Sequence, residues 1–100
     1  MRKIVMYWRD IPSMVTIKKG RVKGKVMLPD RFQEAIDRAA MRAGKGSSDL
    51  YIAEWRSDTS EIEYDGDLTE LAQTEADALA ASIDAQSLKT LVRNNGFKSV

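Results

Sequence analysis

The stretch from Leu28 to Gly44, LPDRFQEAIDRAAMRAG, constrains the fold most strongly, because its hydrophobic spacing is that of an amphipathic helix. The residues expected on its apolar face are Phe32, Ile36, Ala39, Ala40 and Ala43. Asp30, followed three residues later by Gln33, resembles a capping box, and Gly44 is suited to end the helix in a left-handed conformation. We therefore predict a helix whose apolar face is covered by the rest of the chain.

The residue types that are missing restrict the chemistry of the protein. The chain has no Cys, which excludes disulfides, thiolate metal sites and cysteine nucleophiles, and no His, which excludes imidazole ligands and Ser-His-Asp catalysis. No phosphate-binding glycine loop or dinucleotide fingerprint is present. We expect no metal site, no cofactor, no catalytic residues and no enzymatic activity.

The hydrophobic runs are short. None approaches the roughly 20 apolar residues that a membrane-spanning helix needs. The first apolar stretch meets Arg9 and Asp10 before a secretory signal could be completed. We expect a cytoplasmic protein with no membrane partner.

Charge is divided unevenly along the chain. Residues 1–45 contain twelve Lys/Arg and four Asp/Glu, a net charge of +8, whereas residues 46–100 contain four and eleven, a net charge of −7. The favoured interpretation is that the two halves attract each other, within one fold or between two copies in a homodimer. The alternative is that the basic half binds an acidic ligand or nucleic acid.

The remaining pattern predicts an α+β domain spanning residues 1–100. Asp67 and Glu70 form a second capping box, and Asp84 is suited to cap a further helix that Gly96 would end. We predict a mainly antiparallel sheet of about four strands, packed by the central helix and two C-terminal helices. The predicted strands are residues 2–9, 14–19, 25–28, 50–56 and 60–64, and the first of them is expected to lie in the centre of the sheet. A turn is predicted over residues 10–13. The two C-terminal helices are predicted over residues 67–83 and 84–95.

Residues 50–56, LYIAEWR, fit two structures. As a strand, the segment places Tyr51, Ala53 and Trp55 on one face; as a helix it would be short. Its aromatic content favours a strand.

Two tryptophan–arginine pairs, Trp8-Arg9 and Trp55-Arg56, end two of the predicted strands. Such pairs are favoured in the recognition of anions and rings, because the guanidinium group stacks and forms planar hydrogen bonds. The alternative is that both tryptophans are core residues and both arginines reach outward to acids. The hypothetical ligand or partner surface consists of Tyr7, Trp8, Arg9, Asp10, Arg42, Trp55 and Arg56.

Residues 21–56 also resemble a ribbon-helix-helix repressor, in which two chains pair their strands and alternate residues enter the major groove of DNA. In that alternative Lys23, Lys25 and Met27 would face DNA. The residues expected on the opposite, core-facing side are Val22, Val26 and Leu28.

The chain as a whole, however, resembles the bacterial "virulence factor" domain family more, well over residues 2–57 and loosely over the C-terminal helices. The resemblance rests on segments 7–12 (YWRDIP), 28–32 (LPDRF), 35–37 (AID), 40–44 (AMRAG) and 53–56 (AEWR). Members of this family include small free-standing proteins and terminal domains of larger ones. The resemblance implies an accessory or protein-interaction role, with another protein as the partner, and it supplies no catalytic residues.

Overall fold

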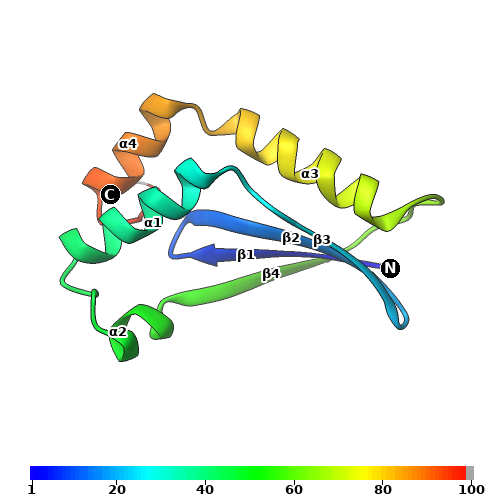
Figure 1. The fold of residues 1–100 in the computed structure, drawn as a ribbon, viewed down its shortest axis with the longest axis horizontal. Coiled ribbons are helices and arrows are strands. Elements are labelled where there is room, and N and C mark those ends of the chain that lie inside the picture. The colour runs from blue at the N-terminus through cyan, green and yellow to red at the C-terminus, as the bar shows by residue number, and fades with distance from the viewer. Residues whose placement is uncertain (99–100) are drawn as a thin grey trace.

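The computed structural model describes residues 1–98, apart from the side chain of Ser48, and shows the predicted α+β fold (Figure 1). Within these residues four strands form one sheet, accompanied by four helices. The elements are β1 (Arg2–Trp8), β2 (Ile11–Lys19), β3 (Val22–Met27), α1 (Asp30–Arg42), α2 (Ser48–Ala53), β4 (Trp55–Glu61), α3 (Leu68–Ser82) and α4 (Ala85–Arg93).

The strands are ordered β3-β2-β1-β4, and every neighbouring pair is antiparallel. A tight turn at Arg9 and Asp10 joins β1 to β2, and a turn at Gly20 (φ 60°) joins β2 to β3. Glycine adopts this left-handed conformation without steric cost. Because β4 returns to pair with β1, the first strand is central, as the apolar residues on both of its sides predicted.

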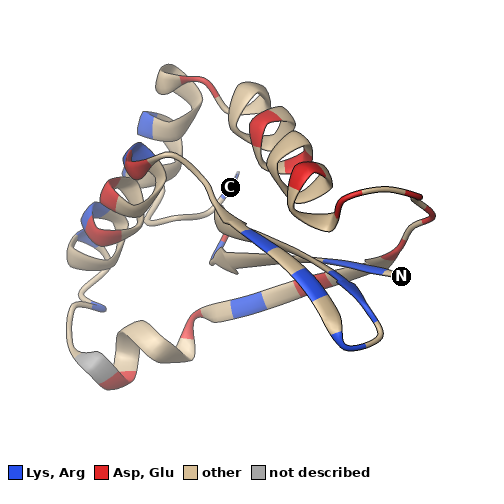
Figure 2. Cartoon of the chain, turned by 45° about the vertical axis from the view of Figure 1, so that its right-hand side comes forward, with Lys and Arg blue, Asp and Glu red and all other residues tan. Residues whose placement is uncertain are grey.

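Helix α3 packs across one face of the sheet, over β2 and β3 (Figures 1 and 2). The side chain of Asp67 accepts a hydrogen bond from the backbone N–H of Glu70 (2.9 Å), which confirms the predicted cap. The buried face of α3 is a stripe of small residues, Ala72, Ala76 and Ala80. Small side chains allow the helix to approach the sheet closely.

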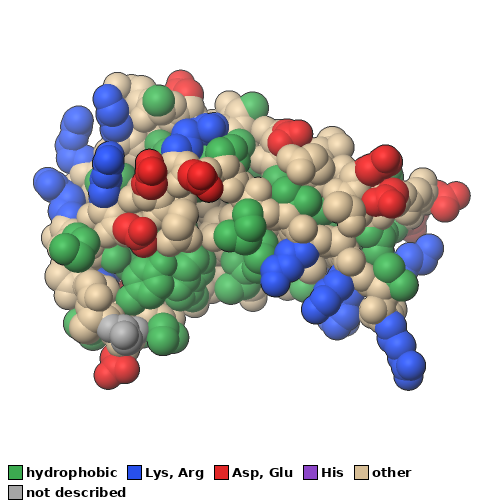
Figure 3. Space-filling model, in the orientation of Figure 1, with side chains coloured by type: hydrophobic (Ala, Val, Ile, Leu, Met, Phe, Trp, Pro, Cys, Tyr) green, Lys and Arg blue, Asp and Glu red, His purple; other side chains and the backbone are tan. Residues whose placement is uncertain are grey.

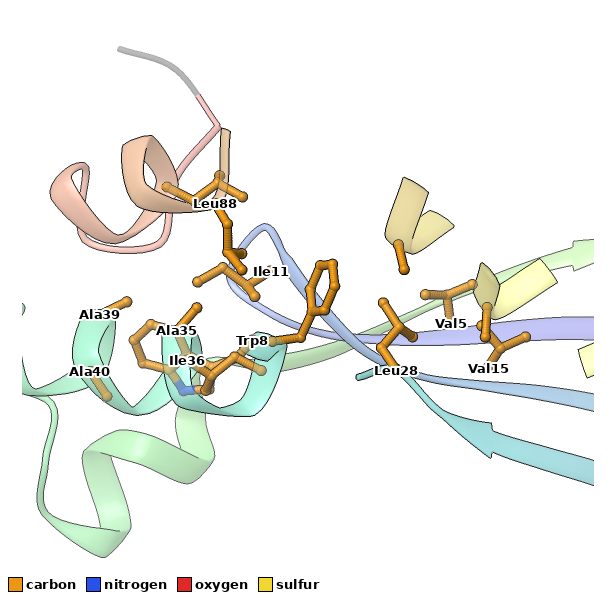
Figure 4. Close-up of a cluster of buried hydrophobic side chains, with 14 of the residues drawn as sticks. Val5, Trp8, Ile11, Val15, Leu28, Ala35, Ile36, Ala39, Ala40 and Leu88 are labelled. Carbon is orange, nitrogen blue, oxygen red and sulfur yellow. The ribbon is translucent and has the colours of Figure 1, made fainter. Parts of the chain in front are cut away.

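Helices α1 and α4 pack against each other and close one end of the sheet. The predicted helix is confirmed, and Phe32, Ile36, Ala39 and Ala40 are buried on it. Figure 4 shows side chains from β1, β2, α1 and α4 meeting there, among them Trp8, Ile11, Ile36 and Leu88. This cluster is the larger part of the core.

The prediction of a strand over residues 50–56 is wrong for its first five residues. Residues 48–53 form α2, and only Trp55 and Arg56 belong to a strand. The cause lies in tertiary contacts: the carbonyl of Tyr51, in the last turn of α2, accepts a hydrogen bond from the indole Nε1 of Trp8 (2.9 Å) in addition to one from the backbone N–H of Glu54 (3.3 Å). The Tyr51 ring also stacks on Trp8 with the centroids 6.0 Å apart.

Two predicted boundaries differ for reasons of strand geometry. The turn predicted over 10–13 is confined to residues 9 and 10, and β2 already begins at Ile11. Pro12 is tolerated in β2 because the pairing register with β1 shifts beside it, where a ladder hydrogen bond is not required. The separate strand predicted over 60–64 is absent from the described residues, since β4 runs without interruption from Trp55 to Glu61.

Two side-chain predictions also fail. The capping box at Asp30 and Gln33 does not form: Pro29 is the N-cap residue of α1, without a side-chain cap, and Gln33 instead donates to Asp37 (3.0 Å) and to the Tyr51 hydroxyl (3.2 Å). Val22, predicted to face the core, is 64% exposed because it lies at the turn end of β3, beyond the reach of α3.

Candidate functional site

The structure brings six of the seven predicted site residues together where β1 ends and β4 begins. Trp8 pairs with Trp55 across the two strands, and Tyr7 pairs with Arg56. We call these residues, Tyr7, Trp8, Arg9, Asp10, Trp55 and Arg56, the Trp–Arg cluster. Arg42 is not part of it: on the last turn of α1, its Nε donates to the carbonyl of Arg93 (3.1 Å) beside a groove between α1 and α4.

Arg9 is enclosed by the cluster and not presented to solvent. Its side chain is only 9% exposed, and its guanidinium carbon lies 5.1 Å from the centre of the Trp8 ring and 4.5 Å from that of Phe97. It donates to the carbonyl of Asn95 (2.8 Å) and to Glu54 (3.3 Å). Arg9 therefore connects the residues after α4 to the end of β1, by a hydrogen bond to Asn95 and by its contact with the Phe97 ring.

The guanidinium group of Arg56 also makes several contacts within the fold. Its Nε donates to the carbonyl of Arg9 (2.9 Å), and its terminal nitrogens lie 3.1 Å from Asp10 and 3.2 Å from Asp58. Its guanidinium stacks on Tyr7, 4.4 Å from the ring centre. Desolvation acts to lower the pKa of Arg56, but the hydrogen bonds to Asp10 and Asp58 outweigh it and raise the pKa. Burial, followed by the charge of Asp58, raises the pKa of Tyr7.

These contacts give the Trp–Arg cluster a structural role. The core alternative is correct for Trp8, which is fully buried, but Trp55 is only half-buried. The two arginines reach acids at Glu54, Asp10 and Asp58, as that alternative predicted. Ligand or partner binding by the cluster stays a prediction. Among the described residues, Nε of Arg9 is a buried polar atom without a hydrogen-bond partner.

A second surface emerges from the register of the sheet. Side chains alternate between the two faces of a strand, so Val5 and Val15 face α3 while Ile4, Met6 and Met14 point to the opposite side. On that side Met6, Met14 and Met27 stand in one row across β1, β2 and β3. The next row contains Ile4, Thr16 and Lys25. We call these six residues the open face.

No helix within residues 1–98 covers the open face along its length. Helices α1, α3 and α4 lie on the other side of the sheet, and α2 reaches only the Trp8–Trp55 end (Figures 1 and 2). Figure 3 shows hydrophobic side chains between α1 and α2, bordered by Lys and Arg side chains toward the β2–β3 hairpin. Met27 is 57% exposed and Lys25 is also exposed, whereas Ile4, Met6, Met14 and Thr16 are half-buried.

The methionine row was not recognised from the sequence, although a pattern for it exists. Ile4 and Met6 alternate with Val5, and Met14 and Thr16 alternate with Val15. An apolar residue on both sides of a strand predicts cover on both sides, yet within residues 1–98 the helix that packs over β2 and β3, α3, lies on one side of the sheet. The alignment of the three methionines depends on strand register, which the sequence alone does not provide.

The charge division along the sequence persists in space. Acids follow α3 and the segment before it, whereas Lys and Arg line the β2–β3 hairpin (Figure 2). Four side-chain ion pairs join a cation of the basic half to an acid of the acidic half: Arg2–Glu61, Lys3–Glu75, Arg9–Glu54 and Lys45–Glu54. The N-terminal amine adds a pair with Glu61, and Arg56–Asp10 joins the halves in the opposite sense. The attraction predicted between the halves therefore operates, in part, inside one chain.

Two further features concern the described part of the chain. No group of three or more carboxylates there is placed to hold a metal ion. None of its helices combines the length and the apolar character required to cross a bilayer.

Comparison with known proteins gives one match. No curated protein and no solved structure matches the chain. A family model described as "Virulence factor" matches residues 6–92, which include β2 to β4 and α1 to α3 completely, the last three residues of β1, and all of α4 except Arg93. The matched range contains the whole Trp–Arg cluster and three of the strands entirely. The chain therefore belongs to the Virulence factor family.

Proposed function

We propose that this protein is an accessory, non-enzymatic interaction domain that binds another protein through the open face of its sheet. The observation that carries the proposal is the alignment of Met6, Met14 and Met27 on three adjacent strands, on a side that no described helix covers. Methionine side chains are flexible and polarizable, so a row of them adapts to the apolar side chains of a partner.

The charge around the open face defines the chemistry of the partner. Lys25 lies in the row next to the methionines, and Arg2, Lys18 and Lys23 share the row beyond it. Of these four, only Arg2 has a carboxylate within ion-pair distance among the described residues, Glu61 at 3.6 Å. An apolar segment followed by Asp or Glu residues would match this arrangement, with its apolar part on the methionines and its acids at the lysines.

Site-specific photo-crosslinking tests the proposal. A benzophenone amino acid at position 27 is expected to crosslink a protein in the native host, and the crosslinked peptide is expected to be apolar with flanking acids. Position 41 is the matched control, because Met41 is also an exposed methionine (74%) but lies on α1. The double substitution Lys23→Glu and Lys25→Glu should abolish the crosslink. Equal crosslinking from both positions, or a basic crosslinked segment, would contradict the proposal.

DNA binding is the second candidate, and one observation favours it. Lys23, Lys25 and Met27, the residues of the ribbon-helix-helix alternative, are all exposed along the edge strand β3. Duplex DNA binding that weakens steeply between low and physiological salt, and that is lost on replacing Lys23 and Lys25 with Gln, would favour this candidate over a protein partner. The absence of salt-dependent binding would remove it.

A further inference from the structure

A groove of about 370 Å³ runs between α1 and α4, on a different part of the molecule from the open face. Its floor is apolar: Ala35 and Leu88 are buried, and Val92 is half-buried. It extends along α1 from Arg31 to Arg42, eleven helical steps, which at the rise of an α-helix corresponds to about 16 Å. The volume lies within the range typical of small-molecule sites.

The rim of the groove is strongly basic. Five cations line it, Arg31, Arg38, Arg42, Lys89 and Arg93, against one acid, Glu34. Within residues 1–98, no carboxylate lies within ion-pair distance of any of the five. This contrasts with Arg9 and Arg56 of the Trp–Arg cluster, whose guanidinium groups are paired with Glu54, Asp10 and Asp58.

The cations are concentrated at one end of the groove. Arg38 and Arg42 are four residues apart and so share a face of α1, and the hydrogen bond from Arg42 to the Arg93 carbonyl joins this face to the last turn of α4. At the other end, Arg31 donates to the carbonyl of Ala80 (3.2 Å). The groove therefore has three arginines at one end and an apolar floor leading away from them.

We propose that this groove binds an amphipathic anion, a small molecule with an alkyl or aryl body and a single carboxylate or phosphate head. The body would lie on Ala35, Leu88 and Val92. The head would be bound by Arg38, Arg42 and Arg93, because guanidinium groups form paired, charge-assisted hydrogen bonds with the oxygens of carboxylates and phosphates.

Titration of the ¹⁵N-labelled full chain with decyl phosphate and with decanoate, both below their aggregation concentrations, tests this inference. At least one probe is expected to bind saturably and to shift amide resonances in α1 and α4. Replacing Arg38 and Arg42 together with Gln should weaken binding at least about tenfold, which corresponds to about 1.4 kcal/mol. The same charge change at Lys23 and Lys25, in the hairpin, should leave the affinity unchanged.

A second variant tests the groove without touching its arginines. Ala85 is exposed at the first residue of α4 and lines the groove, so Ala85→Glu adds a negative charge there while favouring the N-terminus of the helix. This substitution should weaken binding several-fold, whereas Ala81→Glu, at an exposed position of α3 outside the groove, should not.

Four results would overturn the inference. The first is the absence of saturable binding by both probes, and the second is equal binding of 1-decanol, which lacks the charge. The third is an equal loss of affinity in the hairpin variant, which would indicate general electrostatic attraction. The fourth is binding of anionic vesicles or of an acidic peptide when neither soluble probe binds, which would assign the surface to a macromolecule.

Discussion

Substituting Gly24 with Ala tests how closely α3 approaches the sheet. A Cβ atom built on Gly24 would lie 2.5 Å from the carbonyl carbon of Leu68 and 2.5 Å from the backbone nitrogen of Thr69. Ordinary contact begins near 3.4 Å, so the first turn of α3 would have to move by roughly 1 Å. Backbone atoms cannot relieve this overlap by a change of rotamer, so the helix itself would have to shift. The alanine stripe on the buried face of α3 would then lose contact with β2 and β3.

The expected cost of Gly24→Ala is about 2–3 kcal/mol of unfolding free energy, the upper part of the range for overpacking. For a chain of this size that corresponds to a fall of roughly 8–20 °C in melting temperature. Urea denaturation followed by tryptophan fluorescence measures the change, with the m-value confirming two-state unfolding. Gly46→Ala is the control: its Cβ would meet only the flexible Met41 side chain, at 3.1 Å, so its effect should stay within about 1 kcal/mol. A Gly24→Ala variant within 0.5 kcal/mol of wild type, a threshold of about the size of ordinary surface effects, would refute the reasoning.

Three further predictions concern stability. Trp8→Phe removes the indole donor to Tyr51 and part of a fully buried ring, and should lower the unfolding free energy by about 2 kcal/mol in the same urea assay; an unchanged midpoint would contradict the role given to Trp8. Asp67→Ala removes the N-cap of α3 and should cost about 1 kcal/mol, whereas Asp67→Ser should retain most of the stability. The hydrogen bond from the Ser87 backbone lowers the pKa of Asp84, so its stabilising contribution is present above the unfolded-state pKa and is lost as the pH falls through the folded-state pKa. Melting temperatures measured from neutral to acidic pH should therefore fall less steeply in Asp84→Asn than in wild type, and parallel curves would count against this assignment.

The helices were the most predictable elements. Their apolar spacing and caps are local properties, so α1, α3 and α4 appear close to where the sequence placed them, with Asp67 and Asp84 as N-caps. Strand positions were predicted less well where tertiary contacts determine whether a segment forms a strand or a helix. Tyr51 follows an alternating aromatic pattern, yet its ring and carbonyl contact Trp8 from a helix. Gly24 lies within the continuous strand β3, and the need for glycine there follows from the close approach of α3, which the sequence alone does not show.

Some positions in the candidate sites could likewise be predicted from the sequence, and others could not. The meeting of Trp8 with Trp55 was predicted only in part: β1 and β4 are neighbours, but Trp55 and Arg56 begin β4 and do not end a strand over 50–56. Arg42 was misplaced because its position depends on how α1 packs against α4. The methionine row depends on the register of three strands, which no pattern within one strand determines.

The most direct test of the proposed function uses the methionines as reporters. The methyl groups of ¹³C-methyl-labelled methionine give separate signals, and the partner identified by crosslinking can be added to the full chain. Resonances of Met6, Met14 and Met27 should shift or broaden, while that of Met41, exposed on α1, should stay in place. A partner that perturbs Met41 and leaves the three methionines of the open face unchanged would contradict the account.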